Sequence, residues 1–170
     1  MSLLIMRGIC ELGGSYGGRL EVELIEALER GRCFARLRFL GPRWDDERCE
    51  WSWRHREAID LDRMLLCTDA LVAFASALGA WARLPLDRLR VPSFTHEAEL
   101  ARGWPERVSI AVGPPPRYTL GDRALLKARV IAGGRQTLAA FAIDVSGAAV
   151  FAEDVDEAVG ALGARGRRTR

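Results

Sequence analysis

Strict alternation between apolar and charged residues is the feature that most constrains how this chain can fold. Glutamates separate the apolar residues of one segment, and arginines interrupt those of the next. The apolar residues are Leu20, Val22 and Leu24 in the first segment and Cys33, Ala35, Leu37 and Phe39 in the second. Because a two-residue period puts successive side chains on opposite faces of a strand, both segments are predicted to be half-buried strands.

The two segments, 20–26 and 33–39, are predicted to pair as an antiparallel hairpin in which paired residue numbers sum to 59. This register gives four matched pairs, Val22–Leu37 and Leu24–Ala35 on the buried face and Glu21–Arg38 and Glu23–Arg36 on the exposed face. A one-residue slip would set apolar side chains opposite charges on both faces. The remaining connection, Ala27 to Arg32, contains Gly31, which suits a positive φ.

The later part of the chain predicts more strands. Residues 57–66 fit either a strand or the start of a helix, and the glycine-rich run 13–18 is predicted to be a hairpin loop. The other predicted strands cover about residues 3–12, 49–56, 108–112, 126–130 and 137–145. In 49–56, the residues Cys49, Trp51, Trp53 and His55 are predicted to share one face.

Two helices complete the predicted fold. A central apolar helix is predicted over about residues 69–84, with Thr68 as its N-cap. Its core stripe is Leu71, Phe74, Ala75, Leu78 and Trp81. A C-terminal helix is predicted over about residues 149–162, with Gly163 as its C-cap. Runs of strands followed by a helix predict an α+β fold in which an antiparallel sheet carries both helices.

The charge distribution predicts one domain over 1–163 and a basic flexible tail over 164–170. The chain has 25 basic and 23 acidic residues, and four arginines but no acid lie in the last seven residues. The other 163 residues therefore hold 21 basic (25 less 4) and 23 acidic residues. Because a nucleic-acid-binding body would be basic, no nucleic-acid partner is predicted.

Cysteine usage and hydropathy favour a cytoplasmic protein. Cys10, Cys33, Cys49 and Cys67 are scattered without a C-x-x-C motif, as expected of small buried residues in a reducing compartment. The longest apolar stretch, 70–82, is too short to span a bilayer, so no membrane partner is predicted. Arginine makes up 24 of the 25 basic residues and asparagine is absent, which suggests a GC-rich bacterial genome.

No motif for catalysis, metals or cofactors occurs in the sequence with both its spacing and its required context. The run 13–18 lacks the spacing and the lysine of a phosphate-binding loop. His55 and His96 are the only histidines, and neither has a second histidine at metal-ligand spacing. The run 13–18 also contains the letters of G-x-S-x-G, in Gly13-Gly14-Ser15-Tyr16-Gly17, but no helix pattern follows it, as the nucleophile turn of a hydrolase requires. We therefore predict no catalytic, metal or cofactor-binding residues and a non-enzymatic protein.

One segment is a candidate for contact with another protein. The predicted partner-binding residues Trp44, Asp45, Asp46 and Glu47 lie in a loop between two strands, flanked by arginines. Tryptophan and arginine are typical anchors of protein interfaces. The alternative is that Trp44 packs back onto the edge of the sheet while the acids are solvated.

A loose resemblance to a known family covers about residues 57–162. The run Leu66-Cys67-Thr68-Asp69-Ala70-Leu71 enters a helix that ends Leu78-Gly79-Ala80-Trp81, and Phe94-Thr95-His96-Glu97-Ala98-Glu99-Leu100 follows. Two strands and a C-terminal helix come next. This order resembles the small bacterial immunity proteins of the WapI type. The resemblance implies a protein without catalytic residues that binds and blocks a partner toxin.

Three functional hypotheses follow. The first is a bacterial, immunity-like protein that binds and neutralises a partner protein. The second is a small-ligand-binding protein or an unrecognised enzyme, with a pocket near Trp51, Trp53 and His55. The third is a self-associating protein, a homo-oligomer that buries the apolar back of the 69–84 helix between copies.

The tryptophan segment yields a direct test. If Trp51 faces the core, Trp51→Ala should lower the free energy of unfolding by about 3–5 kcal/mol, as large-to-small aromatic substitutions do. Chemical denaturation of the two proteins measures the difference. A loss below about 1 kcal/mol would show an exposed tryptophan and would favour a recognition surface.

Overall fold

A computed structural model gives the fold of the chain. It describes residues 9–14, 18–45, 47–48, 50–83, 96–102, 107–113, 124–132, 134–143 and 145–168. In these ranges, four strands precede the first helix, α1 (Thr68–Ala82): β1 (Ile9–Gly13), β2 (Arg19–Leu28), β3 (Arg32–Asp45) and β4 (Glu50–Cys67). Four more described strands precede the second helix, α2 (Val145–Arg168): β5 (His96–Arg102), β6 (Arg107–Gly113), β7 (Ala124–Ala132) and β8 (Arg135–Ile143).

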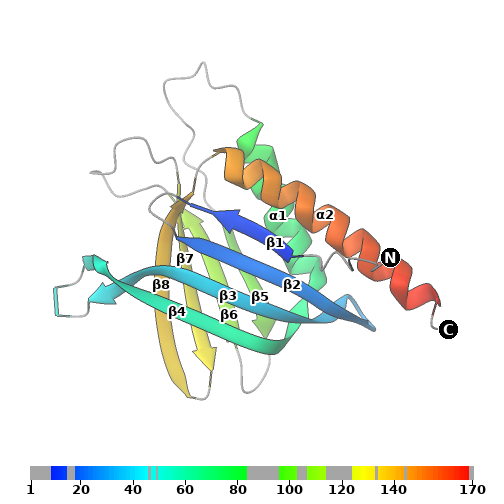
Figure 1. Ribbon diagram of the computed structural model, residues 1–170, viewed down its shortest axis with the longest axis horizontal. Coiled ribbons are helices and arrows are strands. Elements are labelled where there is room, and N and C mark those ends of the chain that lie inside the picture. The colour runs from blue at the N-terminus through cyan, green and yellow to red at the C-terminus, as the bar shows by residue number, and fades with distance from the viewer. Residues whose placement is uncertain are drawn as a thin grey trace, which may run out of the picture.

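The predicted α+β class is confirmed, and within the residues that the structure describes the two halves of the chain follow the same plan of four strands and a helix. Every strand pairing is antiparallel, so each half is a meander. The meanders join through β3 and β8 into one sheet of order β1-β2-β3-β8-β7-β6-β5, with β4 on the other side of β3. Their strands run crosswise to each other in Figure 1.

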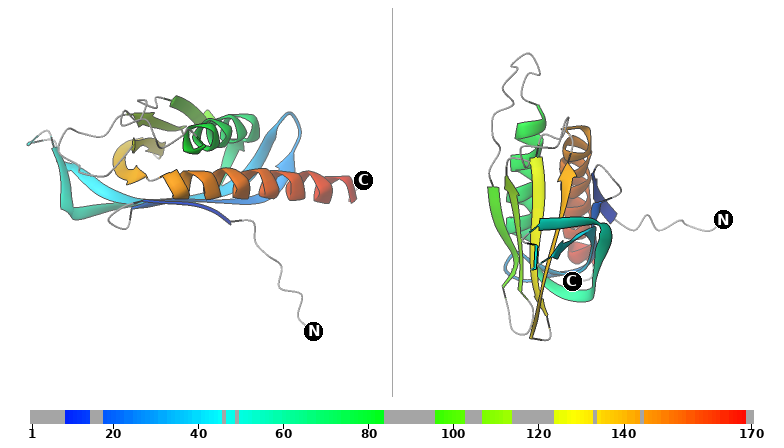
Figure 2. Two further views of the ribbon diagram at one scale, coloured as in Figure 1. Left: turned by 90° about the horizontal axis from the view of Figure 1, so that it is seen from above. Right: turned by 90° about the vertical axis from the view of Figure 1, so that its left-hand side faces the viewer.

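The two helices pack against each other and against the inner faces of the meanders. Figure 2 shows α2 lying along the β1–β2 side, while α1 lies beside β5. Phe74 of α1 and Phe151 of α2 meet edge to face, with ring centroids 6.3 Å apart. A Cβ on Gly79 would lie only 2.9 Å from the Cβ of Ala152, so this glycine lets the helices approach closely. None of the helices in the described part of the chain is long and apolar enough to cross a membrane.

The predicted β2–β3 register is confirmed over most of its length. Partner numbers sum to 59 from the pair Arg19–Leu40 to the pair Leu24–Ala35. A bulge at Ile25 then shifts the sum to 60, which the alternation did not reveal because Ile25 is an exposed apolar residue. The strands also extend further than expected and leave only residues 29–31 as the turn. Gly31 adopts the expected positive φ of 66°.

The central helix has the predicted core face but a different start. All five predicted stripe residues are buried. The prediction that Thr68 is the N-cap is wrong, because Cys67 holds that position and makes no side-chain cap. The Thr68 N–H instead donates to the carbonyl of Gly31 at 2.9 Å, and its hydroxyl hydrogen-bonds to Cys33. On the outer side of α1, Ala73, Ser76 and Ala80 are exposed, so the self-association hypothesis stays a prediction.

The C-terminal helix is longer than the sequence predicted. It spans Val145–Arg168 rather than 149–162, and Gly163 lies inside it, so the predicted C-cap is wrong. Residues 164–168, expected in a flexible tail, are helical, while the last two residues lie outside the described part. The helix buries Phe151, Val155 and Leu162 as predicted. A Cβ on Gly160 or Gly163 would meet nothing within 4 Å, so neither glycine is required by a close contact, and the helix continues past both.

Three glycines allow the two meanders to meet. A Cβ on Gly18 would lie 2.1 Å from the Cβ of Phe141, and a Cβ on Gly41 would lie 2.4 Å from the carbonyl oxygen of Ala140. Gly14 forms an isolated bridge with Ile143 and is equally crowded by β8. The predicted hairpin loop at 13–18 joins β1 to β2, and its Gly14 makes room for the backbone of β8 while its Gly18 makes room for the side chain of Phe141.

Replacing these glycines should separate the meanders. Gly18→Ala and Gly41→Ala should each lower the free energy of unfolding by about 1–3 kcal/mol or more, because overpacking forces the backbone to shift. Gly113→Ala is the matched control, since a Cβ there meets nothing within 4 Å. Denaturation curves measure all three. Equal, small effects at the three positions would contradict the close approach of β8.

Candidate functional site

The predicted partner-binding segment lies at the end of the β3–β4 hairpin. The expectation that Arg43–Arg48 is a loop is wrong in its first half, because β3 continues to Asp45 and only residues 46–49 connect the strands. The register sets Trp44 opposite Trp51 and Asp45 opposite Glu50. Glu47 is exposed, Asp46 lies outside the described residues, and so do the side chains of Trp44 and Asp45.

A bulge of three residues separates this hairpin end from the rest of β4. Pro42 pairs with Arg56, but the next residue, Arg43, pairs with Ser52, so residues 53–55 have no partner on β3. The alternation predicted for 49–56 is therefore interrupted. His55 is exposed, and its Nδ1 lies 3.0 Å from the Ser52 hydroxyl across the bulge.

The hairpin end is held at its base and extends away from the helices. Arg43 pairs with Ala139 of β8 on the edge opposite β4, which fixes the hairpin to the second meander. In Figures 1 and 2 the end of the hairpin and the C-terminal end of α2 lie at opposite extremes of the molecule. The candidate residues are thus presented on a supported extension of the sheet. The Trp51 and Trp53 side chains lie outside the described residues, so the pocket predicted near them stays a prediction.

The outer face of the first meander carries a ladder of ion pairs. Arg38 contacts Glu21 at 3.2 Å, as the predicted register requires. Arg36 donates two hydrogen bonds to Asp60, at 2.7 and 3.0 Å, and lies 3.4 Å from Asp62. These hydrogen bonds lower the pKa of Asp60 and raise that of Arg36. The acids of β4 that complete the ladder could not be assigned from the sequence.

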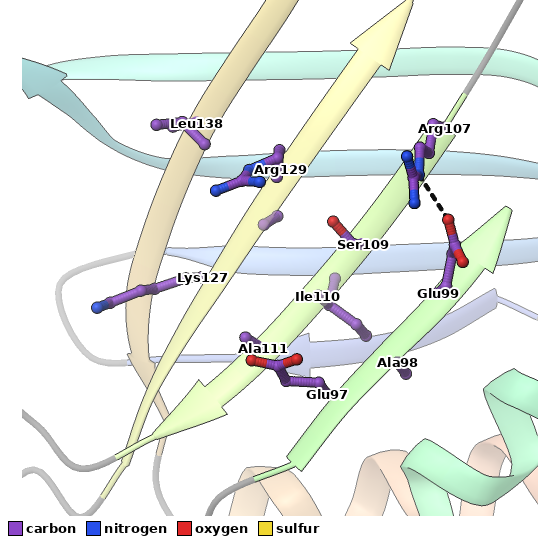
Figure 3. A pocket seen from close by; sticks show the side chains of 11 residues that line it. Glu97, Ala98, Glu99, Arg107, Ser109, Ile110, Ala111, Lys127, Arg129 and Leu138 are labelled. Carbon is purple, nitrogen blue, oxygen red and sulfur yellow. Dashed lines mark hydrogen bonds and ion pairs between the residues drawn. The ribbon is translucent and has the colours of Figure 1, made fainter. Parts of the chain in front are cut away.

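The outer face of the second meander is hollowed instead. A groove of about 640 Å³ runs over β5, β6, β7 and β8 (Figure 3). Its middle consists of the small residues Ser109 and Ala111 of β6. Glu97 and Glu99 of β5 line one side. Lys127 and Arg129 of β7 line the other and reach toward β8 in Figure 3.

Charges in this groove are only partly matched. Arg107 Nε lies 2.6 Å from the carboxylate of Glu99. Glu97, Lys127 and Arg129 form no ion pair or side-chain hydrogen bond with the residues that the structure describes. Lys127 and Arg129 share a face because they lie two residues apart on one strand, and Glu97 and Glu99 share one for the same reason. The sequence did not reveal that the two faces adjoin, because that follows from the strand order.

Neither a metal site nor an activated thiol is found within the described ranges. No group of three or more histidine, cysteine or acidic residues there could hold a metal ion. Cys10 and Cys33 are fully buried, as predicted, and Cys67 is half-buried. Burial, with a smaller contribution from Asp154, raises the pKa of the Cys10 thiol to about 12. Burial also raises the pKa of Cys33. Because the thiolate is the nucleophile, neither residue is suited to covalent catalysis.

Thiol labelling checks this assignment. At pH 8 a thiol of pKa about 12 is ionised in roughly one molecule in ten thousand. Cys10 and Cys33 should therefore stay unmodified by iodoacetamide in the folded protein and react readily in guanidinium chloride. Peptide mass mapping follows each site, with half-buried Cys67 as the internal comparison. Rapid modification of Cys10 in the folded protein would contradict its burial.

Comparisons with known proteins provide no further assignment. No protein-family model matches the chain, and no curated protein matches it. The resemblance to the WapI-type immunity proteins therefore remains a hypothesis that rests on the quoted sequence runs. The structure itself presents two candidate surfaces, the end of the β3–β4 hairpin and the groove over β5–β8.

Proposed function

We propose that this chain is a non-enzymatic bacterial protein that works in the cytoplasm, where it binds and neutralises a partner protein as an immunity protein does. The observation that carries the proposal is the β3–β4 hairpin, which extends the sheet away from the helices and carries the predicted partner-binding residues. Its register brings Trp44 and Trp51 opposite each other. Tryptophan is among the residues that contribute most to the affinity of protein interfaces.

The surroundings of the hairpin end favour contact with a protein. Exposed charges of both signs lie close to it, including Glu47, Arg48, Glu50 and Arg54. A rim of mixed charge around an aromatic centre is the usual arrangement of a transient protein interface. The anchoring of Arg43 to β8 supports the proposal as well, because a rigid surface loses less conformational entropy when it binds.

Binding to the products of the flanking genes tests the proposal. The purified chain should form a stable complex with one of these proteins and suppress its toxicity. Trp44→Ala should weaken that complex at least 30-fold, because a central interface residue contributes about 2 kcal/mol or more. Isothermal titration calorimetry measures the affinity. The control is Glu153→Ala, a substitution of an exposed residue on α2, which should leave the affinity unchanged.

A second variant separates loss of contact from loss of folding. Glu47→Arg reverses an exposed charge at the hairpin end, so it should lower the free energy of unfolding by no more than about 1 kcal/mol, the limit for an exposed ion pair, while it weakens the complex. If neither adjacent gene product binds, or if both variants bind as tightly as the unmodified protein, the hairpin is not a partner-binding site.

A further inference from the structure

The two meanders treat their outward charges differently. On the first, Arg36 and Arg38 of β3 are matched to acids on β2 and β4 across the sheet, as at Arg38–Glu21 and Arg36–Asp60. On the second, one acid and two bases in the groove have no partner in the described part of the chain: Glu97, Lys127 and Arg129. The centre of the first face is occupied by its own ion pairs, whereas the groove on the second has charges available for a ligand.

The unmatched charges lie on opposite sides of a row of small residues. The register places Ala111 between Glu97 and Lys127, and Ser109 between Glu99 and Arg129. Strands β5 and β7 are two strand spacings apart, or about 10 Å. Figure 3 shows the Glu97 carboxylate near Ala111, while Arg129 lies near Leu138 and Lys127 extends across β8, where the register sets it opposite Ala140. The groove thus has a negative side, a small-residue floor and a positive side.

We propose that this groove binds a short zwitterionic peptide, with its ammonium group at Glu97 and its carboxylate at Lys127 and Arg129. An extended peptide covers about 3.3–3.6 Å per residue, so three residues span about 10 Å. The volume of about 640 Å³ lies in the range of small-molecule sites, about 300–1,000 Å³. Ser109 supplies a hydroxyl for the peptide backbone, and Leu138 supplies apolar contact.

Other occupants fit the groove less well. A polyanion would bring its phosphates against Glu97 as well as against the two bases. A second copy of the same face would complement the charges, but two hollow surfaces that meet would leave an unfilled space between them. The peptide site is separate from the β3–β4 hairpin end, so it does not depend on the proposed neutralisation of a partner protein.

Calorimetric titration with alanine peptides of one to five residues tests the proposal. Trialanine or tetra-alanine should bind best, and alanine itself should bind at least tenfold more weakly. N-acetylation or C-amidation of the best peptide should each weaken binding at least tenfold, because each removes one charge. In Glu97→Gln, N-acetylation should no longer matter, while C-amidation still does. In the double variant Lys127→Gln/Arg129→Gln, C-amidation should no longer matter, while N-acetylation still weakens binding.

Matched control variants and sedimentation complete the experiment. Glu153→Gln and Arg32→Gln remove exposed charges outside the groove and should leave peptide binding unchanged. The proposal is overturned if no alanine peptide binds at millimolar concentration, or if binding ignores either end group. It is overturned too if the protein sediments as a dimer that Lys127→Gln/Arg129→Gln dissociates, since a second copy would then occupy the groove.

Discussion

The close approach of β8 to glycines 14, 18 and 41 is the contact on which the rest of the structure depends. Any side chain at these positions would displace the backbone or the ring of Phe141, so glycine is required for the two meanders to share one sheet. The rings of Phe39 and Phe141, with centroids 5.3 Å apart, then close the core between them. The same strand supports the base of the hairpin through Ala139 and lines the groove through Leu138. Both candidate surfaces are therefore positioned by one strand.

The β2–β3 hairpin could be predicted from the sequence because both of its faces carry local information. Apolar partners and ion-pair partners select the same register. Because they agree, no shifted register satisfies both faces equally well. The bulge at Ile25 lacked such a signal, since an exposed isoleucine fits either register. The three-residue bulge in β4 was hidden for a similar reason. Residues 53–55 continue the alternation of their neighbours in composition, while the backbone around Pro42 and Arg43 departs from it.

The groove was beyond prediction for a different reason. The outward direction of Lys127 and Arg129 follows from alternation with the buried residues of β7, and Glu97 and Glu99 follow in the same way on β5. Their common site depends on β6 lying between these strands, and on Ser109 and Ala111 being the residues in register. Strand order is a long-range property that no single segment encodes. The hairpin candidate was easier to find, because its residues are contiguous in the chain.

The outward charges of the two meanders differ in their role, although both meanders have the same order of strands. Exposed ion pairs contribute little to stability, but they exclude wrong registers, and the first meander uses them across three strands. The second meander fixes its register with buried alternation in β6 and β7 instead, since Val108, Ile110 and Val112 face buried partners. Its outward charges are not needed for folding, which leaves them available for recognition. A cleft with unmatched charges of both signs selects a ligand that carries both, because any other ligand leaves one of them unpaired.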